Sequence, residues 1–112
     1  MTNEEVIDEV TKISEAHDRR IVKIGKCNYL IQLDKKTVQE GLDKCQKIWD
    51  KMDINVTYRS QVPEDIDKEL QVIEDERDIL FKNIGKQYFM IDEYMRYLAE
   101  DEVKKKELNH DE

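Results

Sequence analysis

The fold class predicted from the sequence depends on residues 20–33, which read RIVKIGKCNYLIQL. The part before Gly25 is rich in β-branched residues, and after it Tyr29, Ile31 and Leu33 alternate with other side chains. β-Branched composition and period-two alternation are typical of strands, and a glycine between two such runs favours a turn. The stretch therefore predicts a β-hairpin, and with it a fold that contains a sheet.

Helices are expected on both sides of this hairpin. Thr2 and Glu5 have the spacing of a capping box, and apolar residues behind them recur every three or four positions, which predicts a helix over residues 3–17. A second predicted helix covers residues 37–52, with Thr37 as its cap. The apolar stripe of this second helix consists of Val38, Leu42, Cys45, Trp49 and Met52.

Residues 54–59 complete the predicted sheet. Ile54, Val56 and Tyr58 alternate, and their residue types favour a strand. The predicted fold is therefore α+β, in which a small three-stranded antiparallel or mixed sheet, made of hairpin 20–33 and this strand, is packed by the two flanking helices.

The C-terminal part of the chain is predicted to be helical over residues 63–107. Pro63 suits a first helical turn because its missing N–H has no partner there, and apolar residues beyond it keep the spacing of three and four. Gly85 costs about 1 kcal/mol against alanine inside a helix and is also a natural cap residue. One long helix and two helices broken at Gly85 both fit, and a second hairpin at 79–91 is a third alternative, because the sequence around Gly85 echoes that around Gly25.

Length and composition predict one soluble intracellular domain. A chain of 112 residues can bury one core, and no low-complexity linker divides it. Residues 1–107 are predicted to form a single compact domain, and residues 108–112 a frayed acidic tail. The sequence contains neither an apolar run of roughly 18 residues nor a signal-peptide core, so a cytoplasmic protein with no membrane partner is expected.

The charge of the chain is unevenly distributed. Residues 1–60 carry 11 acidic and 11 basic side chains, whereas residues 61–112 carry 16 acidic and 8 basic ones, which places the whole net charge of −8 in the second part. A local excess of four positive charges lies between residues 18 and 36. Electrostatic attraction therefore favours a basic partner for the C-terminal helices.

The motifs of catalysis and of cofactor binding are missing from the sequence. The soft metal ligands His17, Cys27, Cys45 and His110 are scattered, and no pair has the spacing of a zinc site. The three glycines are far apart, so no glycine-rich loop can hold a phosphate, and neither serine lies in a nucleophile motif. The sequence predicts that the protein is not an enzyme and binds no metal or cofactor.

The leading hypothesis is a non-catalytic protein-interaction module, acting as a regulator, inhibitor or assembly factor. Its acidic C-terminal helices would bind a basic or apolar partner surface, and a mimic of DNA charge is a narrower version. The wide apolar stripe of the C-terminal region fits core, a seam between two copies, or a groove for another protein. The candidate partner-binding residues are Glu74, Asp75, Asp78, Phe81, Tyr88, Asp92, Tyr94, Met95 and Tyr97.

The alternative hypothesis is a small nucleic-acid-binding protein that uses the basic segment 18–36. Its candidate residues are Arg19, Arg20, Lys23 and Lys26. The order of predicted elements is similar to that of small RNA-binding domains of the KH kind, but the Gly-x-x-Gly loop of that family is missing. A sequence pI of about 4.9 also opposes a polyanion, so this alternative ranks second.

One stretch of the C-terminal region resembles a known family. Residues 79–86, ILFKNIGK, resemble the hairpin entry of prefoldin-type chaperones. Those proteins flank the hairpin with two long helices, whereas the strands predicted here and Pro63 interrupt residues 1–78. No function is therefore carried over from the resemblance.

Overall fold

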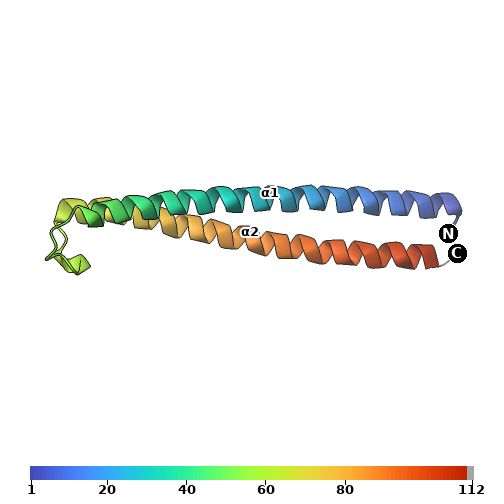
Figure 1. Cartoon of the computed structure of the whole chain (residues 1–112). Coiled ribbons are helices and arrows are strands. Elements are labelled where there is room, and N and C mark those ends of the chain that lie inside the picture. The colour runs from blue at the N-terminus through green and yellow to red at the C-terminus, as the bar shows by residue number, and fades with distance from the viewer. Residues whose placement is uncertain (111–112) are drawn as a thin grey trace. The chain divides into compact units, whose positions relative to one another are not determined.

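The computed structural model describes residues 1–110, and its regular structure is helical. Helix α1 spans Asn3–Asp50, the short 3-10 helix η1 spans Arg59–Gln61, and helix α2 spans Glu64–His110 (Figure 1). This part of the chain contains no strand. The predicted α+β fold with a three-stranded sheet is therefore wrong.

The residues of the predicted sheet occupy other structures. The predicted hairpin at 20–33 lies inside α1, and the predicted strand at 54–59 lies in the connection between the helices and ends at the first residue of η1. Gly25 does not turn the chain, because it is a helical residue without a positive φ. Strand propensity measures how well side chains fit a half-buried surface, and packing readily overrides it.

A seven-residue repeat explains why helix continues through the predicted hairpin. Buried or half-buried residues recur along α1 at alternating steps of four and three, at Val6, Val10, Ile13, His17, Arg20, Ile24, Cys27, Ile31, Asp34, Val38, Gly41, Cys45 and Ile48. The same steps relate buried or half-buried residues of α2, at Ile66, Leu70, Ile73, Arg77, Leu80, Ile84, Gln87, Ile91, Tyr94, Leu98, Asp101, Lys105 and Leu108. This is the spacing of positions a and d in a coiled coil, which keeps one seam of each helix against the other.

The chain divides into two compact units. The loop unit is Ile31–Gly85, and the terminal unit combines Met1–Leu30 with the part of α2 that begins at Lys86. Within each unit, a segment of α1 lies beside a segment of α2 that runs in the opposite direction (Figure 1). Each unit is therefore a pair of antiparallel helical segments.

The loop unit contains the best-packed part of the seam. Ile31 and Leu70 are each 1% exposed, the lowest values in the core. Gly41 occupies a core position, and a Cβ added there would lie 3.3 Å from Cγ2 of Ile73. The missing side chain at Gly41 therefore allows α1 and α2 to approach closely at this point.

The connection between the helices is held by polar contacts. Oε1 of Gln61 accepts hydrogen bonds from the backbone N–H groups of Thr57 at 2.8 Å and Tyr58 at 3.0 Å. Arg59 donates from Nε to Oδ1 of Asp67 at 2.6 Å, and it also forms an ion pair with Glu74. These contacts attach the loop to the first turns of α2.

Helix α2 is continuous through Gly85, where the sequence also allows a break. Gly85 lies inside the helix, and neither a helix end nor a hairpin occurs at residues 79–91. The stretch 79–86, which resembles a prefoldin hairpin entry, is likewise helical. The protein does have two long helices, but residues 51–63 connect them. Residues 111 and 112, part of the tail predicted at 108–112, lie outside the described residues.

Candidate protein-binding surface

An apolar stripe runs along α2 beside the seam. It consists of Phe81, Tyr88 and Met95, which are spaced by seven residues and are 52%, 45% and 56% exposed. Each directly follows a residue at position d of the repeat, so each occupies position e. We call these three residues the α2 stripe.

Helix α1 carries apolar residues at the same position of its own repeat. Ile7 and Ile21 follow core residues and are 62% and 50% exposed. In an antiparallel pair of helices, the e positions of both helices flank the same side of the seam. In the terminal unit, Ile7 and Ile21 therefore border the same side as Tyr88 and Met95, and we call these four residues the terminal face.

Two predicted partner-binding aromatics take part in helix pairing instead. Tyr94 occupies a core position, and Nζ of Lys23 lies 5.7 Å from the centre of its ring. The ring of Tyr97 lies 5.0 Å from the guanidinium carbon of Arg20 and 5.3 Å from that of Arg96. Cations over aromatic faces stabilise such contacts, so these two rings belong mainly to the terminal unit itself.

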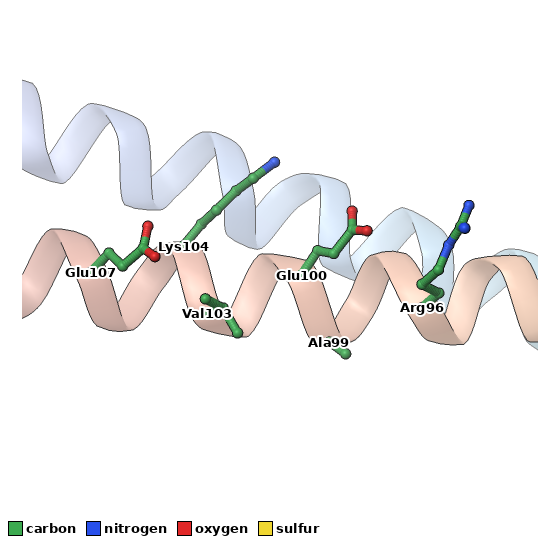
Figure 2. A pocket seen from close by; sticks show the side chains of 6 residues that line it. All are labelled: Arg96, Ala99, Glu100, Val103, Lys104 and Glu107. Carbon is green, nitrogen blue, oxygen red and sulfur yellow. The ribbon is translucent and has the colours of Figure 1, made fainter.

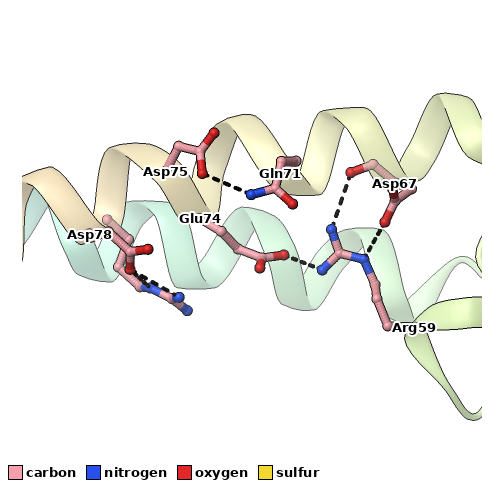
Figure 3. Close-up of polar contacts among 7 residues, drawn as sticks. Arg59, Asp67, Gln71, Glu74, Asp75 and Asp78 are labelled. Carbon is pink, nitrogen blue, oxygen red and sulfur yellow. Dashed lines mark hydrogen bonds and ion pairs between the residues drawn. The ribbon is translucent and has the colours of Figure 1, made fainter.

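The predicted acidic residues divide into paired and outward-facing groups. Glu74 is bound by Arg59, Oδ1 of Asp75 accepts a hydrogen bond from Gln71 at 2.8 Å, and Asp78 lies 3.3 Å from Arg77 (Figure 3). Two hydrogen bonds raise the pKa of Arg59 above its ordinary value. The bond to Glu74 has the larger effect and the bond to Asp67 the smaller one. The carboxylate of Glu74 is therefore paired with Arg59 inside the loop unit.

Asp78 and Asp92 flank the α2 stripe. Both are exposed, and they precede Phe81 and Met95 by three residues each. Residues three apart on a helix are neighbours on its surface. The stripe therefore presents apolar side chains with carboxylates along one border.

The basic residues of the alternative hypothesis lie on α1, in a helix and not in a hairpin. Arg20 donates to Asp101 and to the backbone oxygen of Tyr97, the latter at 3.2 Å. Lys23 lies over the Tyr94 ring, whereas Arg19 and Lys26 are exposed. Two of the four cations are thus engaged inside the terminal unit.

Three hollows formed by described residues of the terminal unit are shallow and lie on outer helix faces. One, of about 440 Å³, is lined by residues of α2 alone; Ala99 and Val103 point to one side of the helix and the longer charged side chains to the other (Figure 2). Its polar lining consists of the charged ends of Arg96, Glu100, Lys104 and Glu107. These ends do not converge on a common point, which distinguishes the hollow from a typical ligand site.

Residues 1–110 contain neither a metal-ligand cluster nor a membrane-spanning helix. No cluster of three or more His, Cys, Asp or Glu side chains there has the arrangement of a metal site. No helix in this range combines the length and apolar character needed to cross a bilayer. Comparison of the chain with protein-family models, curated proteins and solved structures gives no match.

Sequence reasoning missed the contribution of α1 to the surface. The predicted hairpin 20–33 contains Ile21 and the predicted helix 3–17 contains Ile7, but neither is among the predicted partner-binding residues. The signal that could have found them is the seven-residue repeat, because each follows a core position as Tyr88 and Met95 do.

Proposed function

We propose that the protein is a non-catalytic protein-interaction module, a regulator, inhibitor or assembly factor, that binds its partner through α2. One observation supports this more than any other. The α2 stripe remains about half exposed although the core positions beside it already pack between the two helices. A helix that packs only against its partner helix does not require the additional apolar residues of the stripe beside its core positions.

The composition of the stripe suits protein recognition. Aromatic residues and methionine are enriched at protein interfaces, and methionine adapts its shape to different partners. Asp78 and Asp92 border the stripe, and residues 61–112 carry a net charge of −8. An amphipathic helix with basic residues beside its apolar face is the complementary partner.

Electrostatic attraction gives this association a salt dependence. The acidic part of the chain would speed encounters with a basic partner, and added salt would slow them. The cytoplasm is the proposed location, where the free thiols of Cys27 and Cys45 stay reduced.

Capture from a native lysate, compared between two matched variants, tests this function. Phe81→Lys changes the stripe, whereas Ile79→Lys changes a similarly exposed apolar residue two positions away on another face of α2. The immobilised wild type and Ile79→Lys should retain the same discrete protein, less of it at high salt, and Phe81→Lys should lose it. Retention of nothing by the wild type, or equal loss by both variants, would overturn the proposal.

A further inference from the structure

We infer that the terminal unit pairs with a second copy of the same chain through the terminal face, so that two antiparallel helix pairs form a four-helix bundle. The inference goes beyond the proposed function by naming a second copy of the chain as a further partner, bound through the terminal face. Four properties of the chain support it: its exposed area, the width of its apolar stripes, the weakly apolar seam of the terminal unit and the distribution of its charge.

The accessible area of the chain is large for its mass. It amounts to 8685 Å². A compact monomer of 13.5 kDa exposes about 6,500 Å². The surplus is about a third of the compact value, and it exceeds the roughly 800 Å² that each partner contributes to a standard stable interface. The chain as a whole therefore exposes enough surface for an interface of standard size.

The apolar stripes of the terminal unit have the width found in bundles. A two-stranded coiled coil needs apolar residues only at a and d, whereas a helix that faces the core of a bundle adds position e or g. Ile7 and Ile21 on α1, with Tyr88 and Met95 on α2, make that addition on both helices. On α1 the same position also holds the uncharged Ser14 and Asn28, and on α2 it also holds Glu102, which belongs to the acidic segment 90–103.

The seam of the terminal unit is weakly apolar on its own. Among its described residues, Val6 and Cys27 are the buried apolar side chains. Five of the other core positions hold polar residues, namely His17, Arg20, Gln87, Asp101 and Lys105, and the remaining apolar ones are only half-buried. A second helix pair against the terminal face would bury Ile21 and Met95 and supply the apolar area that the seam lacks.

Charge selects the arrangement of the two copies. Residues 18–30 hold four basic and one acidic side chain, and residues 90–103 hold five acidic and one basic. The contacts of Arg20 with Asp101 and of Lys23 with Tyr94 place these segments at the same level.

The copies therefore lie parallel, with α1 of each beside α2 of the other. In this two-fold arrangement every pair of neighbouring helices joins a basic segment to an acidic one, and the like-charged segments lie on the diagonals.

The mass of the purified protein in solution, measured by sedimentation equilibrium, tests the inference. At about 50 μM the wild type should have twice the mass of one chain. Met95→Lys places a charge in the terminal face, whereas Phe89→Lys places the same charge on an outer face of the same helix. Met95→Lys should weaken the dimer about 100-fold, and Phe89→Lys should leave it unchanged.

A second pair of variants on α1 keeps the test decisive if Met95→Lys unfolds. Ile21→Lys should dissociate the dimer, and Val22→Lys, which changes the next residue, should not. Circular dichroism would verify that each variant remains helical.

A monomeric wild type at about 200 μM, or dissociation by Phe89→Lys and Val22→Lys instead, would overturn the inference. A monomer that still captures a discrete protein in the Phe81→Lys comparison would leave the proposed function standing, with a different protein as its partner.

Discussion

Arg20 on α1 donates a hydrogen bond to the carboxylate of Asp101 on α2, across 81 positions of sequence. Asp101 is 4% exposed, and both residues occupy core positions of the seven-residue repeat. A buried charge is stable only when it is paired, so a shift of one helix along the other would leave the Asp101 carboxylate without its partner. The pair therefore fixes the alignment of the helices in the terminal unit.

Removal of Arg20 should destabilise the protein strongly. Arg20→Met leaves Asp101 buried without its cation, and we expect the free energy of unfolding to fall by about 3 kcal/mol. Urea unfolding followed by circular dichroism measures the loss. Lys12→Met is the matched control, because its ion pair with Glu9 is solvent-exposed and should contribute less than about 1 kcal/mol.

Removal of both charges should restore much of that stability. The double variant Arg20→Met, Asp101→Leu buries two apolar side chains in place of the ion pair, a replacement that is often neutral or stabilising. Equal losses in the single and double variants would show that Arg20 acts through something other than Asp101.

The three glycines should respond differently to alanine. A Cβ at Gly25 or Gly85 meets no atom within 4 Å, so Gly25→Ala and Gly85→Ala should each raise the free energy of unfolding by roughly 0.5–1 kcal/mol through helix propensity. At Gly41 the Cβ would lie 3.3 Å from Ile73, so Gly41→Ala should gain less and Gly41→Leu should lose about 1–3 kcal/mol. Thermal unfolding compares the four variants, and a stabilising Gly41→Leu would contradict the close approach of the helices there.

The contacts of Arg59 should hold the loop against α2. Arg59→Met removes the donor to Asp67 and Glu74, so hydrogen–deuterium exchange over residues 51–63 should become faster. Lys68→Met, which removes only the exposed ion pair with Glu64, should leave that exchange unchanged. Identical exchange in wild type and Arg59→Met would show that the loop is held in some other way.

Titration of Arg59 should not weaken these contacts near neutral pH. Its pKa is raised in the folded protein, chiefly by the hydrogen bond to Glu74. A cation with a raised pKa contributes stability below its unfolded pKa and loses it only as pH rises through the folded value. Both values are strongly alkaline, so the contribution from Arg59 should persist up to about pH 10.

The helical parts of the fold were visible in local sequence. The N–H of Glu5 donates to Oγ1 of Thr2 at 3.1 Å, as the first capping box predicts, and α2 begins directly after Pro63. Thr37 misled the prediction, because its hydroxyl donates to the carbonyl of Leu33 inside α1 instead of capping a new helix. Local motifs thus identified the starts of both long helices and predicted a third start, at Thr37, that does not exist.

The sheet was predicted wrongly because two effects disagree over residues 20–33. Local composition favours strands there, whereas packing against the other helix favours a helix. β-Branched residues and Gly25 favour strands within that window, whereas the repeat through Arg20, Ile24, Cys27 and Ile31 continues the helix on both sides. An arginine is stable at a core position only when its charge is paired, and the partner of Arg20, Asp101, lies on the other helix. The surface was predicted in part: Phe81, Tyr88 and Met95 share one stripe of α2, and Tyr94 faces the seam.

A photo-crosslinking amino acid placed at two neighbouring positions tests the α2 stripe most directly. Tyr88 belongs to the stripe, and Phe89 is equally apolar but lies on an outer face of α2. The proposed surface predicts a discrete adduct from position 88, either with a second copy in purified protein or with another protein in lysate, and none from position 89. Adducts from position 89 alone, or from neither position, would contradict it.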